Sequence, residues 1–167
     1  PPAPVTAPPA PAPAPTPVCE CGHCNGFPSP AVLRNSHSDR RLYARRGHSG
    51  EDEVGADDGN TVHADQKWYI ANAGNGAYTI TNYHSDRRLF AQDDNDAQDG
   101  VGAMASGNVW DDQKWYIELD ADCKYGIRNY HSGRRLFAQR NKIWDDGVGA
   151  MASGTFWADQ KWFIEEA

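Results

Sequence analysis

A short motif, Asp-Gln-Lys-Trp, occurs three times in this chain, and its copies follow one another at a constant interval of 47 residues. The glutamines of the three copies are Gln66, Gln113 and Gln160. Other residues recur at the same interval, namely His37, His84 and His131, and Gly55, Gly102 and Gly149. No insertion separates the copies, so the chain after residue 30 is a threefold internal repeat. Each copy is expected to form one supersecondary unit that buries its apolar face against the other two.

Each repeat contains four short segments that are typical of β-strands. In the second copy they are AYTITNYHS at 77–85, RRLFAQ at 87–92, GVGAMAS at 100–106 and QKWYIEL at 113–119. The Gly, Asp and Asn residues between them favour turns. Three such units predict an all-β domain of twelve strands. A β-propeller also uses four-stranded units, but it needs about four or more of them to close.

A change in composition divides the chain near residue 30. All 11 prolines lie in residues 1–30, and the opening run PPAPVTAPPAPAPAPTP carries no charge. Such a segment has too little apolar surface to drive folding, which predicts an extended polyproline II arm. We therefore expect a proline-rich arm at 1–18, a cysteine-containing connector at 19–30 and a β domain at 31–167.

The chain contains four cysteines: Cys19, Cys21 and Cys24 in the connector and Cys123 in the β domain. The spacing of the connector cysteines with His23 is similar to that of one ligand pair of a zinc site. The second pair of ligands is missing, so no metal is expected. Cysteines beside a proline-rich leader favour an oxidising compartment, with Cys123 bonded to one of the connector cysteines. The sequence does not indicate which of the three connector cysteines is bonded to Cys123.

The charge of the chain excludes two classes of partner. The net charge is −7 and no basic stripe occurs, so neither nucleic acid nor an anionic membrane is expected as a partner. No apolar run is long enough to span a bilayer. The sequence starts at Pro1 rather than at Met, which is compatible with removal of a leader. We expect a secreted, extracellular protein.

Three four-stranded units that each end in Gln-x-Trp resemble the ricin-B-type β-trefoil lectins. The resemblance covers about residues 31–167 and implies a β-trefoil of three 47-residue repeats. It also implies one shallow sugar pocket per unit, built from an acidic residue early in the second strand, an aromatic platform and polar groups just before the motif. The RRLFAQ segment is in addition similar to a strand of the fascin-like trefoils, which bundle actin inside cells.

This chain departs from the lectin pattern at one position. Where those lectins carry their sugar-binding Asp, it has Tyr43, Phe90 and Phe137. An aromatic ring does not accept two hydroxyl groups as a carboxylate does, so the usual galactose-binding mode is not expected.

The Gln-x-Trp motif itself is expected to be structural. In a strand, Gln113 and Trp115 share a face while Lys114 points the other way, so the pair can enter the core together. The Gln amide can then satisfy backbone groups at a turn. The predicted structural core residues are Gln66, Trp68, Gln113, Trp115, Gln160 and Trp162.

Candidate glycan-binding residues lie on the surface, mostly just before each motif. An exposed Trp can stack on the apolar face of a sugar ring, and nearby carboxylates can accept its hydroxyl groups. The candidates are Trp110, Asp112, Trp144, Trp157, Asp159, His63 and Asp65. The alternative, equally open, is that these tryptophans cap the barrel or pack against a neighbouring subunit.

No pattern indicates catalysis or a cofactor. The order His-Ser-Asp in NYHSDRRL is not a hydrolase triad, because neighbours in a strand point to opposite faces and the third copy has Gly133 in place of the acid. The acidic loop at 93–100 lacks the spacing of an EF-hand. We predict a non-catalytic extracellular β-trefoil that recognises glycans or glycoproteins. The alternative is a structural protomer of an extracellular filament or sheath that self-associates through its arm.

Overall fold

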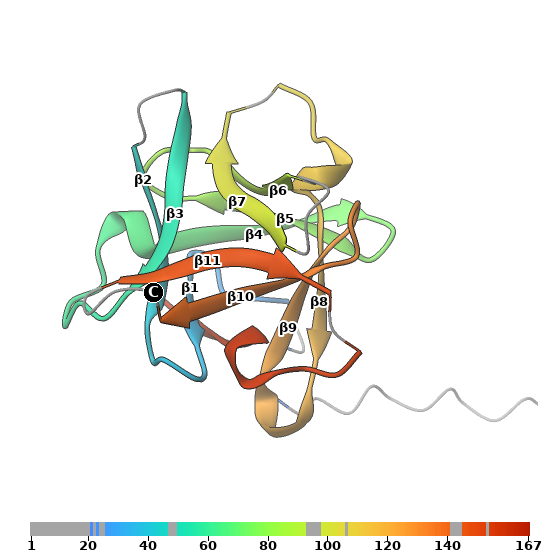
Figure 1. Cartoon of the computed structure of the whole chain (residues 1–167). Coiled ribbons are helices and arrows are strands. Elements are labelled where there is room, and N and C mark those ends of the chain that lie inside the picture. Colours follow the sequence, from blue (N-terminus) through green and yellow to red (C-terminus); the bar gives the residue numbers. More distant parts are fainter. Residues whose placement is uncertain are drawn as a thin grey trace, which may run out of the picture.

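The computed structural model describes residues 21, 23, 26–46, 50–92, 98–105, 107–140, 145–152 and 154–167. In these residues the chain forms twelve antiparallel strands and four short 3-10 helices (Figure 1). The expectations for the arm at 1–18, for Cys19 and Cys24, and for Trp144 fall outside the described residues. The two boundaries that divide the chain into these three segments stay predictions.

Each repeat contributes four strands, as the sequence predicts. The first contains β1 (Ala31–Asn35), β2 (Arg41–Arg46), β3 (Glu51–Asp57) and β4 (Lys67–Gly74). The second contains β5 (Ala77–Asn82), β6 (Arg88–Gln92), β7 (Gln98–Met104) and β8 (Trp115–Leu119). The third contains β9 (Tyr125–Asn129), β10 (Arg135–Arg140), β11 (Asp145–Met151) and β12 (Lys161–Glu166). The 3-10 helices are η1 (Ala64–Gln66), η2 (Asp111–Gln113), η3 (Ala121–Cys123) and η4 (Ala158–Gln160).

Strand pairing divides the twelve strands into a barrel and a cap. The first and last strands of the repeats pair in a closed ring, β1–β4–β5–β8–β9–β12. The middle strands form the hairpins β2–β3, β6–β7 and β10–β11. These hairpins meet one another through β3, β7 and β11, which pair in a triangle over the end of the barrel. A six-stranded barrel closed by three hairpins is a β-trefoil, so the predicted all-β fold class is confirmed.

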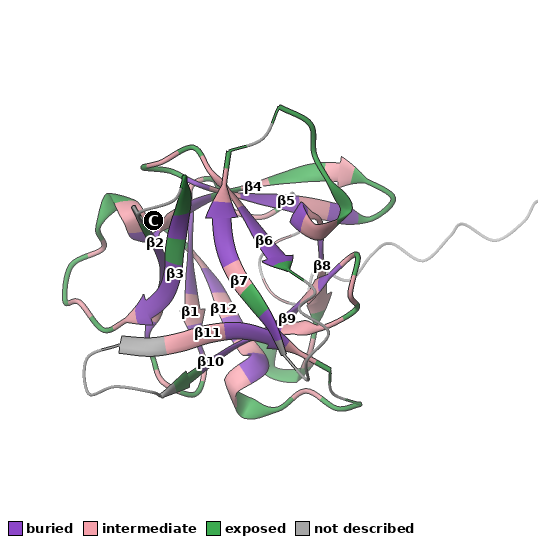
Figure 2. Ribbon diagram, turned by 45° about the horizontal axis from the view of Figure 1, so that its top comes forward, coloured by how far each residue is buried: buried purple, intermediate pink, exposed green. Residues whose placement is uncertain are grey.

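Three tryptophans join the barrel to its cap. Trp68, Trp115 and Trp162 each have 0% of their surface exposed. The indole Nε1 of Trp115 on β8 donates a hydrogen bond of 3.0 Å to the carbonyl oxygen of Leu89 on β6. Trp68 and Trp162 make the same bond within their own repeats. The buried positions run along the barrel and cap strands, whereas the connecting loops are largely exposed (Figure 2).

The motif glutamines are also buried, but not by the strand alternation that we expected. Gln113 is the last residue of η2 and precedes β8, so it enters the core from a 3-10 turn. Its Oε1 accepts a hydrogen bond of 3.3 Å from the backbone N–H of Trp110. The other two glutamines make the equivalent bond in their repeats. The amide therefore satisfies a backbone donor at a turn, which no strand partner reaches.

Buried ion pairs hold consecutive repeats together. Arg87, which precedes β6, lies 2.6 Å from Asp52 on β3 of the first repeat. Arg134 forms the equivalent ion pair with Asp99 on β7. Both carboxylate side chains are fully buried. Arg40, which occupies the same place in the first repeat, is itself only 2% exposed.

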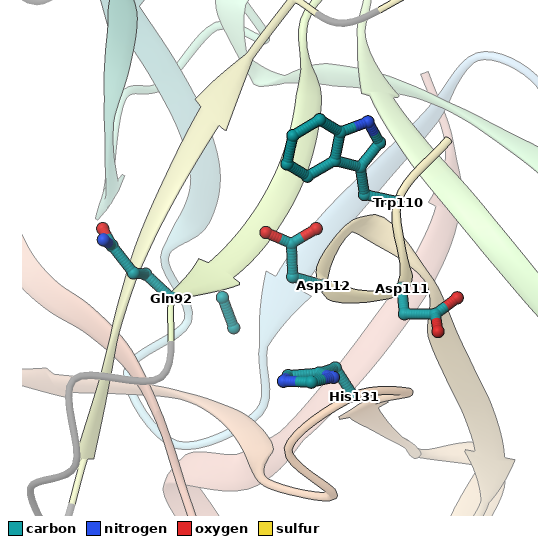
Figure 3. Close-up of a pocket in the computed structure, with 6 residues that line it drawn as sticks. Gln92, Trp110, Asp111, Asp112 and His131 are labelled. Carbon is teal, nitrogen blue, oxygen red and sulfur yellow. The ribbon is translucent and has the colours of Figure 1, made fainter. Parts of the chain in front are cut away.

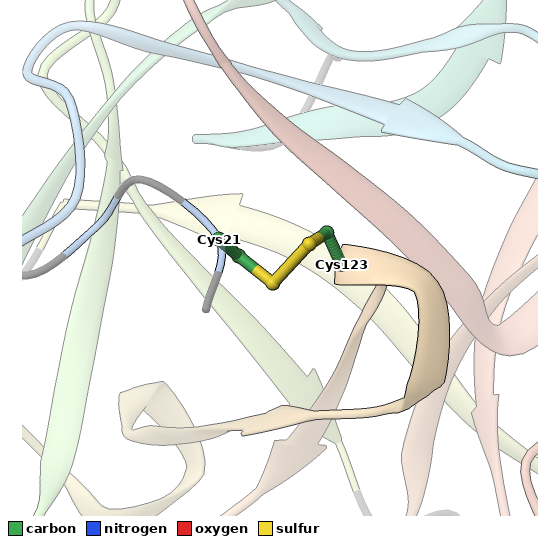
Figure 4. The surroundings of a disulfide bond; sticks show 2 residues. All are labelled: Cys21 and Cys123. Atoms are coloured by element: carbon green, nitrogen blue, oxygen red, sulfur yellow. A yellow bond between two sulfur atoms is a disulfide. The ribbon is translucent and has the colours of Figure 1, made fainter. Parts of the chain in front are cut away.

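The connector is attached to the barrel by a disulfide. Of the three partners open to Cys123, the structure pairs it with Cys21, and their Cα atoms are 5.3 Å apart (Figure 4). A few residues further on, Phe27 packs edge-on against Tyr78 and Tyr125, with ring centroids 5.3 and 5.6 Å apart. Burial raises the pKa of Tyr125. The connector thus covers part of the barrel surface.

Candidate functional site

The residues just before each Gln-x-Trp motif are held at the surface by a rigid turn. In the second repeat, the backbone N–H of Gln113 donates to the carbonyl of Trp110 at 3.1 Å, while the Gln113 side chain accepts from the Trp110 N–H. This reciprocal pair fixes the backbone of Trp110 and leaves its side chain pointing outward, 63% exposed. A large aromatic side chain on a fixed backbone is suited to stacking on a ligand.

A pocket of about 430 Å³ lies beside this tryptophan (Figure 3). Its lining comes from three parts of the chain: the end of β6, the η2 turn, and the turn between β9 and β10 of the third repeat. The lining residues are Ala91, Gln92, Trp110, Asp111, Asp112 and His131. Figure 3 shows the Asp112 carboxylate directed into the space below the Trp110 ring, with Gln92 and His131 on other sides.

One oxygen of the Asp112 carboxylate lacks a hydrogen-bond partner in the described part of the chain. Its Oδ1 is buried and has no hydrogen-bond partner among the described residues. A buried carboxylate oxygen needs a donor, which water or a ligand hydroxyl can supply. Asp111 differs, because it forms an ion pair of 2.8 Å with Lys114 and raises the pKa of that lysine. In Figure 3 the Asp111 side chain points away from Asp112.

One buried side chain ties two walls of the pocket together. The Nδ2 of Asn129 donates to the carbonyl oxygen of Asp112 at 2.7 Å, and its Oδ1 accepts from the backbone N–H of His131 at 3.0 Å. Asn129 itself is 0% exposed. The position of His131 relative to Asp112 is therefore set by the core, although the two residues belong to different repeats.

The third repeat builds a closely similar arrangement. Its Trp157 is 49% exposed, and Asn35 ties the carbonyl of Asp159 to the turn that carries His37. The repeat places Gln139 where the second repeat has Gln92. Only the position of Asp111 differs, because the third repeat has an alanine there.

The first repeat keeps the backbone but changes the side chains. Asn82 ties the carbonyl of Asp65 to the turn that carries His84, as in the other repeats. However, His63 stands in place of the exposed tryptophan, and Arg45 hydrogen-bonds the Asp65 carboxylate at 3.0 Å. The predicted residues His63 and Asp65 therefore occupy equivalent places without forming an equivalent site.

The predicted glycan-binding residues thus fall into two similar clusters and one altered cluster. Trp110 lies with Asp112, and Trp157 with Asp159. Sequence reasoning missed Gln92 and His131, which complete the pocket of the second repeat. The signal for His131 was its recurrence every 47 residues, but nothing local indicated that it faces the preceding repeat. Trp110 and Trp157 are too exposed to cap the barrel of this chain, and contact with a neighbouring subunit stays open.

The aromatic residues at the lectin Asp position are part of the cap. Phe90 is 5% exposed and lies opposite Gly102 in the β6–β7 hairpin. A Cβ atom at Gly102 would lie 2.9 Å from the Phe90 ring, so the glycine is needed for this packing. Phe137 and Gly149 repeat the arrangement. These rings are therefore not available as ligand platforms.

Two absences bear on the site. In the part of the chain that the structure describes, no group of three His, Cys, Asp or Glu side chains is placed to hold a metal ion. None of the helices in those same residues has the length and apolar character needed to cross a bilayer.

Solved structures with a similar fold come from diverse proteins. The designed threefold-symmetric protein ThreeFoil is 22% identical over 82% of this chain and 98% of its own, with a TM-score of 0.66. A Culex salivary protein of the cysteine- and tryptophan-rich family is 20% identical, with coverages of 84% and 96% and a TM-score of 0.68. An exo-β-1,3-galactanase from Clostridium thermocellum is 18% identical over 83% of this chain and 30% of its own, with a TM-score of 0.72. At these identities the likeness concerns the fold alone.

Sequence comparison identifies the family. No curated protein sequence matches the chain significantly. The sequence model of the ricin-type beta-trefoil lectin domain-like family matches residues 64–153, which is more than half of the chain. This match spans the last turn of the first repeat, the whole second repeat and most of the third. Together with the barrel, the three-hairpin cap and the three Gln-x-Trp fastenings, it shows that the chain belongs to the family of ricin-type β-trefoil lectin-like domains.

Proposed function

We propose that this protein is an extracellular carbohydrate-binding module. The observation that carries the proposal is the pocket in which an exposed Trp110 stands above the carboxylate of Asp112 (Figure 3). A sugar ring presents an apolar face of C–H groups and a rim of hydroxyl groups. The indole takes the face, and the carboxylate, the Gln92 amide and the His131 imidazole take the hydroxyls.

The ligand is a neutral saccharide rather than an acidic one. Asp111 and Asp112 both line the pocket, and the chain carries a net charge of −7. A sialylated or sulfated glycan would bring a like charge close to these carboxylates, which disfavours its binding. Gln92 and His131 donate as well as accept hydrogen bonds, and neither requires a charged partner.

The pocket is a binding site and not a hydrolytic one. Hydrolysis of a glycosidic bond uses two carboxyl groups that flank the bond, roughly 5 to 10 Å apart. Of the two carboxylates here, Asp112 lines the space below Trp110, whereas Asp111 points away and is paired with Lys114. Sugar is therefore retained without being cleaved.

The proposed location outside the cell is supported by the cysteine chemistry. The Cys21–Cys123 disulfide attaches the connector to the barrel, and such bonds persist in oxidising compartments. The alternative role as a filament protomer depends on the arm at 1–18, which is not among the described residues. No observation in the β domain favours it.

The test combines a glycan array with titration calorimetry on the full chain. We expect binding to neutral glycans, and we expect Trp110→Ala and Asp112→Asn each to remove the binding equivalent held by this pocket without changing the melting temperature. Tyr83→Ala is the matched control, because Tyr83 is an exposed aromatic (47%) that does not line the pocket. A folded protein that binds nothing on a broad array, or that keeps all its binding equivalents after both substitutions, would refute the proposal.

A further inference from the structure

The three pocket regions differ at a small set of positions, and the differences occur together. The second and third repeats have Gln92 and Gln139 where the first has Arg45. They have Met104 and Met151 where the first has Asp57. In the first repeat, His63 also replaces the exposed tryptophan of the other two. The first repeat thus has an arginine and an aspartate where the other two repeats have uncharged residues.

In the structure, Arg45 contacts both Asp57 and Asp65, and Asp65 is the equivalent of Asp112. The guanidinium of Arg45 forms an ion pair with Asp57, and its Nε donates to Asp65 Oδ2 at 3.0 Å. It also lies 4.1 Å above the ring of Tyr43. Partial burial by itself lowers the pKa of Arg45, but the hydrogen bond to Asp65 and the charge of Asp57 outweigh it, so the net shift is upward.

The bond to Arg45 reduces the hydrogen-bond acceptor capacity that Asp65 has for a ligand, relative to Asp112. Both residues have an unpartnered Oδ1. In Asp65, however, Oδ2 is already bonded to Arg45, whereas the second repeat has Gln92 in place of that arginine beside Asp112. A sugar hydroxyl that approached Asp65 would have to compete with the hydrogen bond that the Arg45 guanidinium already donates to it. His63 also presents a smaller apolar face than an indole.

We infer that the first repeat is closed to saccharide by Arg45, so that the protein binds two saccharides through the second and third repeats. Arg45 sets the number of sites by satisfying internally the carboxylate that a sugar would use. The inference rests on the proposed function, and it adds which of the three repeats are active and which residue inactivates the other one.

The test counts binding equivalents by native mass spectrometry and calorimetry on the full chain. The probes are lactose, β-1,3-galactobiose and mannotriose. Wild type is expected to bind two equivalents of whichever probe it takes, and Trp110→Ala/Trp157→Ala none. Arg45→Gln/Asp57→Met/His63→Trp, which installs the residues of the other repeats, is expected to bind three. Adding these changes to Trp110→Ala/Trp157→Ala should restore one equivalent.

The control is Arg128→Gln, which removes an arginine–carboxylate pair with Glu118 that does not line the Trp110 pocket and should leave two equivalents. Three equivalents on wild type, or one retained by Trp110→Ala/Trp157→Ala, would overturn this inference while leaving the proposed function in place. Both results can be read even if the triple variant does not fold. A folded triple variant with only two equivalents would also overturn it. Wild type that takes up none of the probes, and nothing on the glycan array, would overturn the proposed function and this inference with it.

Discussion

At the scale of single residues, tryptophan has two opposite roles that its surroundings decide. Trp110 and Trp115 are five positions apart, yet the first is 63% exposed and the second is not exposed at all. The η2 turn between them separates the roles, because it presents the first indole to solvent and leads the second into the barrel. The same division occurs between Trp157 and Trp162 in the third repeat.

Replacement of Trp115 by alanine is expected to destabilise the domain severely. The substitution leaves a large cavity and removes the bond from Nε1 to the Leu89 carbonyl, which joins barrel to cap. Loss of a buried Trp typically costs about 3 to 5 kcal/mol of unfolding free energy. Urea denaturation measures the change, and Trp110→Ala, a surface substitution, should stay within about 0.5 kcal/mol of wild type. Equal stability of both variants would show that Trp115 does not stabilise the contact between barrel and cap.

At the scale of strands and hairpins, the cap depends on ion pairs between repeats. Asp52 lies on β3 of the first repeat and Arg87 just before β6 of the second, so their pair links two consecutive units. The Asp52 side chain is fully buried, whereas 19% of the Arg87 side chain remains exposed. Such a pair contributes specificity to the packing of the hairpins more than net stability.

Breaking this pair on one side is expected to cost more than removing both partners. Asp52→Ala leaves the Arg87 guanidinium without its carboxylate in a largely buried place, at a cost of roughly 3 kcal/mol. Asp52→Ala/Arg87→Met removes the charge that would be stranded, and it should be the more stable of the two variants. Chemical denaturation of the wild type, both single variants and the double variant forms a double-mutant cycle. Purely additive losses would contradict a direct interaction between these residues.

The same scale explains what the sequence could and could not predict. The strands and the β-trefoil were predictable, because the 47-residue period and the turn residues are local and repeat in register. The place of Gln113 was not, because the predicted strand began two residues too early, inside a 3-10 turn. The pocket was only half predictable. Trp110 and Asp112 adjoin the motif, whereas Gln92 and His131 are brought there by the pairing of other elements.

At the scale of the whole molecule, the disulfide attaches the connector to a barrel that is otherwise complete. Cys21 and Cys123 are 102 positions apart, so their bond closes a long loop and restricts the unfolded chain. It also keeps Phe27 close to Tyr78 and Tyr125. Loops of this length contribute up to about 4 to 5 kcal/mol in the chain-entropy description.

Cys21→Ser/Cys123→Ser is therefore expected to lower the melting temperature while preserving the fold. The twelve strands pair without the connector, so the circular dichroism spectrum should not change. Calorimetry should show a lower melting temperature than that of wild type. A reductant should not lower the melting temperature of the double variant further through this bond, because the bond is already absent. Glycan binding should persist, because neither cysteine lines the pocket. A double variant as stable as wild type would mean that the disulfide adds nothing to the stability of the domain.

Two binding clusters on one closed barrel also predict a distinct response to dense ligands. The Trp110 and Trp157 clusters belong to consecutive repeats of the same closed sheet, so occupation of one keeps the other within a molecular diameter of the ligand surface. When the spacing of the glycans permits both to engage, linked binding raises the apparent affinity by roughly 10² to 10⁴ over a single site. We expect Trp110→Ala to lose most of this gain on a surface coated with a neutral glycan, while its affinity for the free oligosaccharide at the remaining site is unchanged. Surface plasmon resonance at high and low glycan density, with Tyr83→Ala as control, measures both quantities. A loss of only about twofold at high density would show that the two pockets act independently.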